Sequence, residues 1–371
     1  MKKEARIYVG GHQGLVGSAL VRRLLKQGYE NLVLRSHAEL NLENQSRVEA
    51  FFSTEAPEHV FLAAARVGGI LANNSFPADF IFSNLAIQTN VIHAAAKAGV
   101  RRLLFMGSSC CYPRTCPQPI RESHLMSAAL EETNRAYAVA KIAGLEMCSA
   151  FNRQYGTAFL SVMPTNLFGP GDNFDLESSH VLPALIRKFH LGKLAGKGQW
   201  DAIENDQRIF GPIPGYMFEE LAAISRHRGH AVPGIVANCV RKVTPRFAIT
   251  LWGTGTPKRE FLHVDDLAEA CVTLMSLDND TYAELLQHPD GPLINVGCGE
   301  DHTIAELAQL VREVVGFGGE IRFDASRPDG TPRKLLDVSR LSALGWKPKI
   351  SLQAGVSATY GDYMRKSGYG G

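Results

Sequence analysis

A glycine-rich turn near the start of the chain constrains its fold more than any other feature. The turn directly follows the apolar run 7–9, opens the amphipathic segment 16–27, and consists of Gly11, His12, Gln13, Gly14, Leu15, Val16 and Gly17. Glycines at this spacing allow a tight turn and a close backbone approach to a pyrophosphate, and the N–H groups at the start of the helix attract phosphate oxygens. The pattern predicts a dinucleotide site formed by these seven residues, and not merely a structural glycine turn.

Short apolar runs alternate with helical patterns through the first half of the chain. Buried parallel strands are expected at 7–9, 32–34, 59–62, 103–106 and 159–163, with a further strand returning at 293–296. Helices are expected at 16–27, 46–52 and 87–98. This order is typical of an α/β fold with a doubly wound parallel sheet of the Rossmann type.

The same pattern suggests two domains. We expect residues 1–175 to form the cofactor-binding domain, completed by segments near 260–300, and residues 176–371 to form mainly a smaller substrate-binding domain with a helix at 303–315 and a strand at 320–323. Between 192 and 246 the pattern is irregular, with Gly-rich and Pro-rich pieces around one expected helix at 217–227. A connection this long is usually a lid, an interaction element or an insertion, and the pattern leaves all three open.

Composition excludes several classes of protein. The net charge of +2 comes from interspersed acids and bases, with no charged block for nucleic acid or membranes, and no apolar stretch is long enough to span a bilayer. The N-terminus lacks the apolar segment of a signal peptide, and seven thinly spread cysteines do not suggest a disulfide scaffold or a zinc site. We expect a soluble cytoplasmic protein without a metal, whose diffuse positive charge suits an anionic substrate.

The end of the second expected strand bears on the choice of cofactor. Arg35, Ser36 and His37 stand where an enzyme that uses NAD would place an acid against the ribose 2′-hydroxyl. Arg and a partly protonated His would attract a 2′-phosphate, so these residues favour NADPH. The alternative is that Arg35 and His37 are solvated surface residues.

A candidate catalytic group lies near the fourth strand. Tyr137 and Lys141 are four residues apart, so on a helix they share one face. A lysine cation beside the phenol, together with the positive nicotinamide of the oxidised cofactor, would lower the pKa of the tyrosine and make it a workable acid and base. Ser108 and Ser109 follow the strand 103–106, and either hydroxyl would hold a carbonyl oxygen for Tyr137.

Longer motifs resemble those of the GDP-L-fucose synthases, a family of epimerase-reductases among the extended short-chain dehydrogenases. The motifs lie at 11–17, 63–70, 107–110, 137–141, 163–166, 172–174, 179–181, 252–255 and 259–261. The Val-Gly-Gly-Ile, Ser-Ser-Cys and Asp-Asn-Phe runs are particular to this family, and the match covers nearly the whole chain. The resemblance implies NADPH-dependent 3,5-epimerisation and 4-reduction of GDP-4-keto-6-deoxy-D-mannose to GDP-L-fucose, by a homodimer formed through helices 87–98 and 137–155.

The resemblance also implies roles for single residues. Ser108, Tyr137 and Lys141 would form the reductase triad, and Cys110 with His180 the epimerase acid/base pair. The further cofactor contacts that it implies are Asn41, Leu42, Ala63, Ala64, Met106, Gly107, Ser109, Pro164, Thr165, Asn166, Leu167 and His180. The substrate contacts that it implies are Asn166, Lys188, Trp252, Arg259 and Asp324.

Two departures from the family qualify this interpretation. Gln13 and His37 stand where the family commonly has arginines near the 2′-phosphate, which predicts a weaker preference for NADPH. The connection between 190 and 249 is much longer than in the family, so it would either cover the nucleotide pocket or extend an oligomer contact.

Other nucleotide-sugar enzymes remain alternatives. A dehydratase would need an acid pair where this chain has Ser109 and Cys110, and a simple 4-epimerase has no need of a Cys/His pair. A GDP-L-colitose synthase would share these residues. A cofactor-binding protein without catalysis is the last alternative, and the intact Ser108, Tyr137 and Lys141 argue against it.

Overall fold

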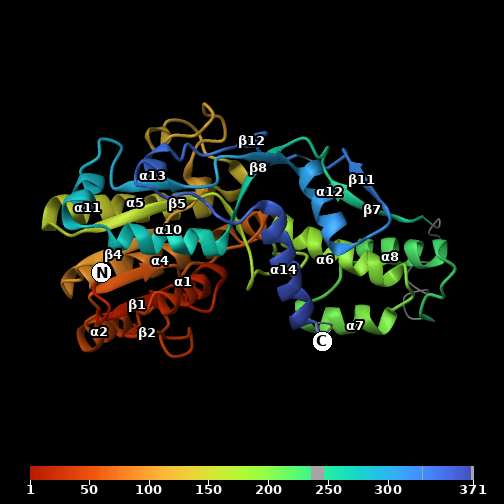
Figure 1. Cartoon of the computed structure of the whole chain (residues 1–371), viewed down its shortest axis with the longest axis horizontal. Helices are drawn as coiled ribbons and strands as arrows, with labels where there is room; N and C mark the ends of the chain where they lie inside the picture. The colour runs from red at the N-terminus through yellow and green to blue at the C-terminus, as the bar shows by residue number, and fades with distance from the viewer. Residues whose placement is uncertain (235–245, 328, 369–371) are drawn as a thin grey trace.

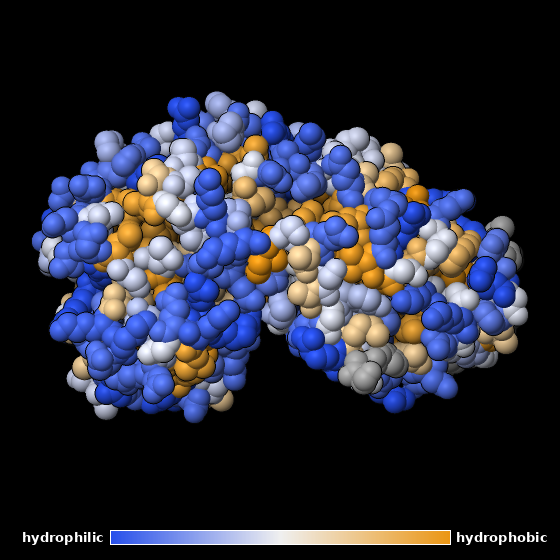
Figure 2. All heavy atoms as spheres, viewed as in Figure 1, coloured by the Kyte–Doolittle hydropathy of each residue, from blue (hydrophilic) through white to orange (hydrophobic). Residues whose placement is uncertain are grey.

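The computed structural model describes residues 1–234, 246–327 and 329–368, and it shows two lobes side by side (Figure 1). The first lobe holds the N-terminus and a large sheet, and the second holds α6, α7, α8, α12 and α14. In the space-filling view the outline is hollowed between the lobes on one side (Figure 2). In the described part of the chain no helix is long and apolar enough to cross a membrane.

The large sheet has six strands in the order β2-β1-β3-β4-β5-β9, and every neighbouring pair is parallel. The strands are β1 (Ile7–Gly10), β2 (Leu32–Val33), β3 (His59–Leu62), β4 (Arg102–Met106), β5 (Phe159–Pro164) and β9 (Leu293–Val296). Their side chains alternate between two buried clusters, so that Ile7 and Val9 face one side of the sheet and Tyr8 the other. The doubly wound α/β fold is confirmed.

Helices cover both faces of this sheet. One face packs against α1 (Leu15–Lys26), α10 (Val264–Ser276) and α11 (Asn279–Leu286), and the other against α2 (Gln45–Glu55), α4 (Pro77–Lys97) and α5 (Arg135–Tyr155). The prediction that α4 begins at residue 87 was wrong, because the helix begins at Pro77. Buried Asn84 and Gln88 interrupt the apolar pattern, because their amides bond backbone groups at Arg66, Phe80 and Ala140.

The second lobe has its own apolar cluster. Its helices and strands are α6 (Val181–Ala195), α7 (Trp200–Phe210), α8 (Gly215–His227), β7 (Ala248–Trp252), α12 (Ile304–Val315), β11 (Glu320–Asp324) and α14 (Leu352–Lys366). Parallel pairing of β7 with β11 forms a two-stranded sheet. A small sheet connects the lobes and consists of β6 (Asn166–Phe168), β8 (Lys258–His263), β10 (Asp301–Thr303) and β12 (Arg333–Lys334). The short helices α3 (Ile70–Ser75) and α13 (Ser339–Ala343) complete the α-helices and strands of the described residues.

The segment 192–246 is more regular than predicted. It contains α7, which the pattern missed, and α8, which begins two residues before the predicted 217; residues 235–245 lie outside the described residues. Only Ile203 and Asp206 of α7 are fully buried, while Trp200, Ala202 and Phe210 pack against the apolar cluster of the second lobe with part of their surface exposed.

A buried ion pair holds α7 in place. Arg187 of α6 and Asp206 of α7 are both fully buried, and their Nε and Oδ1 atoms lie 2.8 Å apart. The remaining Arg187 nitrogens donate to the carbonyl oxygens of Phe174, Phe210 and Gly211. Tyr363 of α14 donates to the other Asp206 oxygen. Every guanidinium nitrogen is thus bonded, and Arg187 with Asp206 joins α6, α7 and α14.

Candidate active site

The glycine turn has the shape that a dinucleotide pyrophosphate requires. Gly11 has a φ of +80°, and a Cβ there would lie 2.7 Å from the backbone N and Cα of Ala64. A Cβ on Gly17 would lie 2.0 Å from the Gly11 oxygen. Gly14 begins α1 without a side-chain cap, so the N–H groups of the first turn are open to an anion. These residues therefore fit a dinucleotide.

The other predicted cofactor residues follow four further strands of the large sheet, on both sides of β1. Arg35 to Leu42 come after β2, Ala63 and Ala64 after β3, Met106 to Ser109 at the end of β4, and Pro164 to Leu167 at the end of β5. Because the strands are parallel, these segments lie at one edge of the sheet, where ligands of such folds bind. The structure therefore brings the predicted set together with the glycine turn.

The Arg35 side chain has partners that the sequence pattern did not indicate. Its Nη2 pairs with Glu55 of α2, its Nη1 donates to the Leu34 oxygen at 2.8 Å, and Glu55 also pairs with Arg6. His37 and Gln13 are exposed. The cation next to the predicted 2′-phosphate position is thus already partly neutralised.

Ser108, Tyr137 and Lys141 lie together beyond the end of β4. Ser108 begins a short 3-10 helix (Ser109–Cys111), its hydroxyl accepts from Cys110 N at 3.2 Å, and it lies close enough to Tyr137 to act on the pKa of the phenol. Lys141 Nζ donates to the Met106 oxygen at 2.8 Å and lies 6.0 Å from the centre of the Tyr137 ring. Burial lowers the pKa of Lys141 to about 8. Burial also raises the pKa of Tyr137, contrary to the lowering predicted from Lys141, so the phenol stays protonated.

Two cations face the Cys110 thiol. Lys334 Nζ of β12 lies 3.9 Å from Cys110 Sγ, and in the small sheet Lys334 stands in register with Arg259 of β8. Arg259 is close enough to Cys110 for their charges to interact. Positive charge at this place would stabilise negative charge that develops on sulfur during proton transfer. Lys334 was missed because it belongs to no motif, and the pairing of β12 with β8 places it beside Arg259 and near the thiol.

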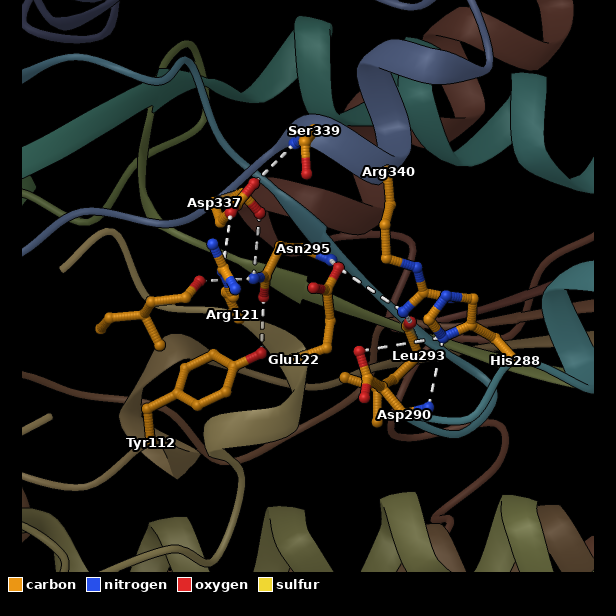
Figure 3. A network of polar contacts seen from close by, with 11 residues as sticks. Tyr112, Arg121, Glu122, His288, Asp290, Leu293, Asn295, Asp337, Ser339 and Arg340 are labelled. Atoms are coloured by element: carbon orange, nitrogen blue, oxygen red, sulfur yellow. Dashed lines mark hydrogen bonds and ion pairs between the residues drawn. The ribbon is translucent and has the colours of Figure 1, made fainter. Parts of the chain in front are cut away.

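A buried polar network fixes the loop that follows Cys110 (Figure 3). Asn295 of β9 accepts from the Tyr112 hydroxyl at 2.6 Å, and its Nδ2 donates to the carbonyl oxygens of Ile120 and Asp337. Its backbone N donates to Glu122, whose carboxylate lies 3.7 Å from Arg340. The network joins the loop after β4 to the segment just beyond Lys334, so it sets the position of Cys110 relative to that cation.

His180 is the N-cap of α6 and is exposed, although the protein around it lowers the pKa of its imidazole through desolvation. The loop before it is held by two of the family-like motifs. Gly69 N donates to the Ser178 oxygen at 2.8 Å, and a Cβ on Gly69 would lie 2.6 Å from the Ser179 oxygen. Asn173 donates to Ser178 as well. The Val-Gly-Gly-Ile and Asp-Asn-Phe runs therefore position His180.

The predicted substrate residues lie on the second lobe and on the small sheet that connects the lobes. Trp252 and Asp324 are paired across β7 and β11, and Lys188 lies two helical turns beyond His180 on α6. The Asp324 carboxylate accepts from Ser326, and the Asn166 amide donates to the Glu260 oxygen at 2.9 Å. Burial lowers the pKa of Lys188. Trp252 and Lys188 are joined through Tyr216, which the sequence interpretation did not include.

Residues 7–206 and 217–285 match the model of the NAD dependent epimerase/dehydratase family. The chain belongs to this family. It is 50% identical to GDP-L-fucose synthase 1 of Arabidopsis thaliana over 98% of this chain and 94% of the relative, and 47% identical to GDP-L-fucose synthase of Escherichia coli (strain K12) over 96% and 95%. The resemblance drawn from the motifs is confirmed.

A solved structure of the same fold gives a further likeness. A GDP-D-glycero-L-gluco-heptose synthase from Campylobacter jejuni, solved in the presence of NADPH, is 38% identical, with a TM-score of 0.82 over 98% of this chain and 99% of that one. As a member of the epimerase/dehydratase family, the protein is an enzyme that uses a nicotinamide cofactor. The glycine turn and the carboxyl ends of the neighbouring strands are where its residues would hold that cofactor.

Proposed function

We propose that this enzyme converts GDP-4-keto-6-deoxy-D-mannose to GDP-L-fucose with NADPH as the reductant. The observation that carries the proposal is the Cys110 thiol, which lies beside the Ser108, Tyr137 and Lys141 group and faces Lys334. A reductase alone needs only the tyrosine group, whereas a second acid/base centre at the same place suits inversion of carbons next to the ketone. Relatives named GDP-L-fucose synthase cover nearly the whole chain.

Each residue has a chemical task in this reaction. The ketone at C4 acidifies the hydrogens at C3 and C5, so Cys110 removes a proton from one face and His180 returns one from the other. Ser108 holds the C4 oxygen, and Tyr137 gives it a proton. Bound NADPH supplies the hydride to C4. The direct test is NADPH oxidation with GDP-4-keto-6-deoxy-D-mannose, followed by identification of the product.

The two proton chemistries are separable by deuterium exchange. In heavy water the wild type is expected to incorporate deuterium at C3 and C5 of the product. Cys110→Ala should lose exchange at both carbons, because the first proton is never removed. His180→Ala should keep some exchange without inversion, because Cys110 returns the proton to the original face. Mass spectrometry and NMR of the product measure both effects.

Cys116→Ala is the matched control for this experiment. Cys116 is a free, partly exposed cysteine that has no role in the proposed chemistry, so its variant should incorporate deuterium like the wild type. Full incorporation and normal fucose formation by Cys110→Ala would remove Cys110 from the mechanism.

The cofactor preference is expected to depend on Arg35 and its partner. NADPH should be preferred over NADH. Arg35→Ala should weaken the binding of NADPH by about 10- to 100-fold, which is the contribution of a charged hydrogen bond, and should change the binding of NADH little. Glu55→Gln should strengthen the binding of NADPH, because it removes the carboxylate that pairs with the Arg35 guanidinium. Steady-state KM values for both cofactors provide the measurement. Equal efficiency with NADH and NADPH in the wild type contradicts this expectation.

We extend the proposal to a homodimer formed through α4 and α5. These helices pack on each other and present Phe82, Val139 and Tyr155 to solvent, with 67%, 40% and 63% of their surface exposed. Such exposed apolar side chains on adjacent helices favour a contact between two copies. Sedimentation analysis tests this part of the proposal.

A second candidate reaction is the reduction of a GDP-4-keto-heptose. The likeness to a GDP-6-OMe-4-keto-L-xylo-heptose reductase from Campylobacter jejuni, 39% identical over 99% of both chains, favours it. The two candidates differ in substrate size at C6, so turnover of the deoxyhexose and heptose substrates under identical conditions distinguishes them.

A further inference from the structure

The inserted segment places an aromatic ring next to Trp252. Tyr216 is the second residue of α8, and its ring centre lies 5.9 Å from that of Trp252, with the ring planes tilted by 42°. Both rings remain accessible, with 38% and 50% of their surface exposed. Two large aromatic side chains that lie together at the surface mark a place where a flat ligand can bury them.

Two elements connect the aromatic pair to the proposed reaction centre, the helix α6 and the strand β8. Lys188 Nζ is 5.7 Å from the centre of the Tyr216 ring. Lys188 also lies about 12 Å along α6 from His180, at the helical rise of 1.5 Å per residue. Trp252 is joined by a short turn to β8, which carries Arg259 close to Cys110. Lys188 thus lies on the helix that follows His180 and contacts the Tyr216 ring, and Arg259 lies on the strand that follows Trp252 and near Cys110.

A buried carboxylate fixes the geometry of the pair. Glu220 lies one turn after Tyr216 on α8, and its Oε1 accepts from Thr250 N of β7 at 3.0 Å. Because Thr250 is two residues before Trp252, this bond fixes α8 relative to the end of β7. The charges of Glu220 and Lys188 also interact. Glu220 thus holds Tyr216 near Trp252 and gives Lys188 a nearby counter-charge.

We propose that Tyr216 is a nucleotide-binding residue, and that with Trp252 it forms a recess for the purine base of the substrate. In this arrangement Lys188 lies toward the diphosphate. The proposal rests on the proposed GDP-sugar substrate and deepens it, because it assigns the base-binding part of the site to the insertion. The insertion then completes the nucleotide pocket instead of serving as an oligomer contact.

Titration with GDP tests this assignment without turnover. Stacking of a base on an aromatic ring is worth roughly 5- to 150-fold in affinity, so Tyr216→Ala should raise the dissociation constant of GDP by that factor. Tyr216→Phe keeps the ring and should bind GDP like the wild type. Calorimetry gives the dissociation constants, and quenching of Trp252 fluorescence upon binding gives a second readout.

Ile209→Ala is the matched control. Ile209 is an apolar residue of the same insertion, 44% exposed on α7, and its variant should bind GDP normally. Unchanged NADPH affinity in Tyr216→Ala shows that the fold is intact. With the GDP-sugar, Tyr216→Ala should raise KM and leave kcat nearly unchanged, because the base lies far from the reacting carbons.

The possible outcomes separate this proposal from the proposed function. Wild-type affinity for GDP in Tyr216→Ala would overturn the assignment of Tyr216, even if the enzyme makes GDP-L-fucose. The wild type could instead fail to bind GDP and bind another nucleoside diphosphate with an affinity that depends on Tyr216. That result would support the assignment of Tyr216 to the base and contradict the proposed GDP-sugar substrate.

Discussion

Replacing Tyr137 with phenylalanine is expected to lower the rate of ketone reduction by about two to four orders of magnitude, the usual worth of a positioned general acid. Tyr137 lies next to Ser108, and burial raises the pKa of its phenol, so it carries the proton that the C4 oxygen needs. The affinity for NADPH should change little. Single-turnover NADPH oxidation with saturating 4-keto substrate measures the effect on the chemical step.

Tyr155→Phe provides the control on the same helix. Tyr155 ends α5 and is 63% exposed, so the loss of its hydroxyl should leave reduction unchanged. Near wild-type turnover of Tyr137→Phe would assign the proton to another donor.

Replacing Asp206 with alanine is expected to lower the free energy of unfolding by about 3–5 kcal/mol. The substitution leaves the fully buried Arg187 guanidinium without a counter-charge, and it also removes the acceptor of the Tyr363 hydroxyl. Denaturant unfolding followed by tryptophan fluorescence reports the change, since Trp200 lies on the same helix as Asp206.

Two further variants make this experiment specific. Glu204→Ala breaks an exposed ion pair with Arg208 on the same helix and should lower the free energy of unfolding by only about 0.3–0.5 kcal/mol. The double variant Arg187→Met with Asp206→Leu should be more stable than Asp206→Ala, because no charge then stays buried. A loss below 0.5 kcal/mol for Asp206→Ala would show that the pair does not hold the lobe together.

The large sheet could be predicted from the sequence because its strands are buried on both faces. Continuous apolar runs such as His59–Leu62 therefore stand out, and the predicted bounds of this strand and of β9 match the structure. The glycine turn could be predicted as well, since backbone contacts at Gly11 and Gly17 exclude any side chain. In both cases a constraint that acts within one segment determines which residue types can stand there, so the sequence of that segment indicates it.

Contacts between distant segments could not be predicted in this way. Lys334 lies 224 residues from Cys110, and the pairing of Arg35 with Glu55 depends on how α2 packs. The helix α7 carries Trp200, Ile203 and Phe210 on the face that packs on the second lobe, and the prediction overlooked this spacing. Its buried ion pair with Arg187 joins distant segments and could not be predicted. Tyr216 was missed for a similar reason, because its partners Trp252 and Lys188 come from β7 and α6.

The Arg187 contacts limit how the protein can be shortened by engineering. Replacing residues 197–246 with a tight turn would remove Asp206 together with the carbonyl oxygens of Phe210 and Gly211 that the guanidinium binds. The truncated protein would then hold an unneutralised cation next to Lys188 on the helix that begins at His180. A minimal version of the enzyme therefore has to exchange Arg187 for an apolar residue in the same step, because trimming the insertion alone would disturb the helix that carries the proposed catalytic histidine.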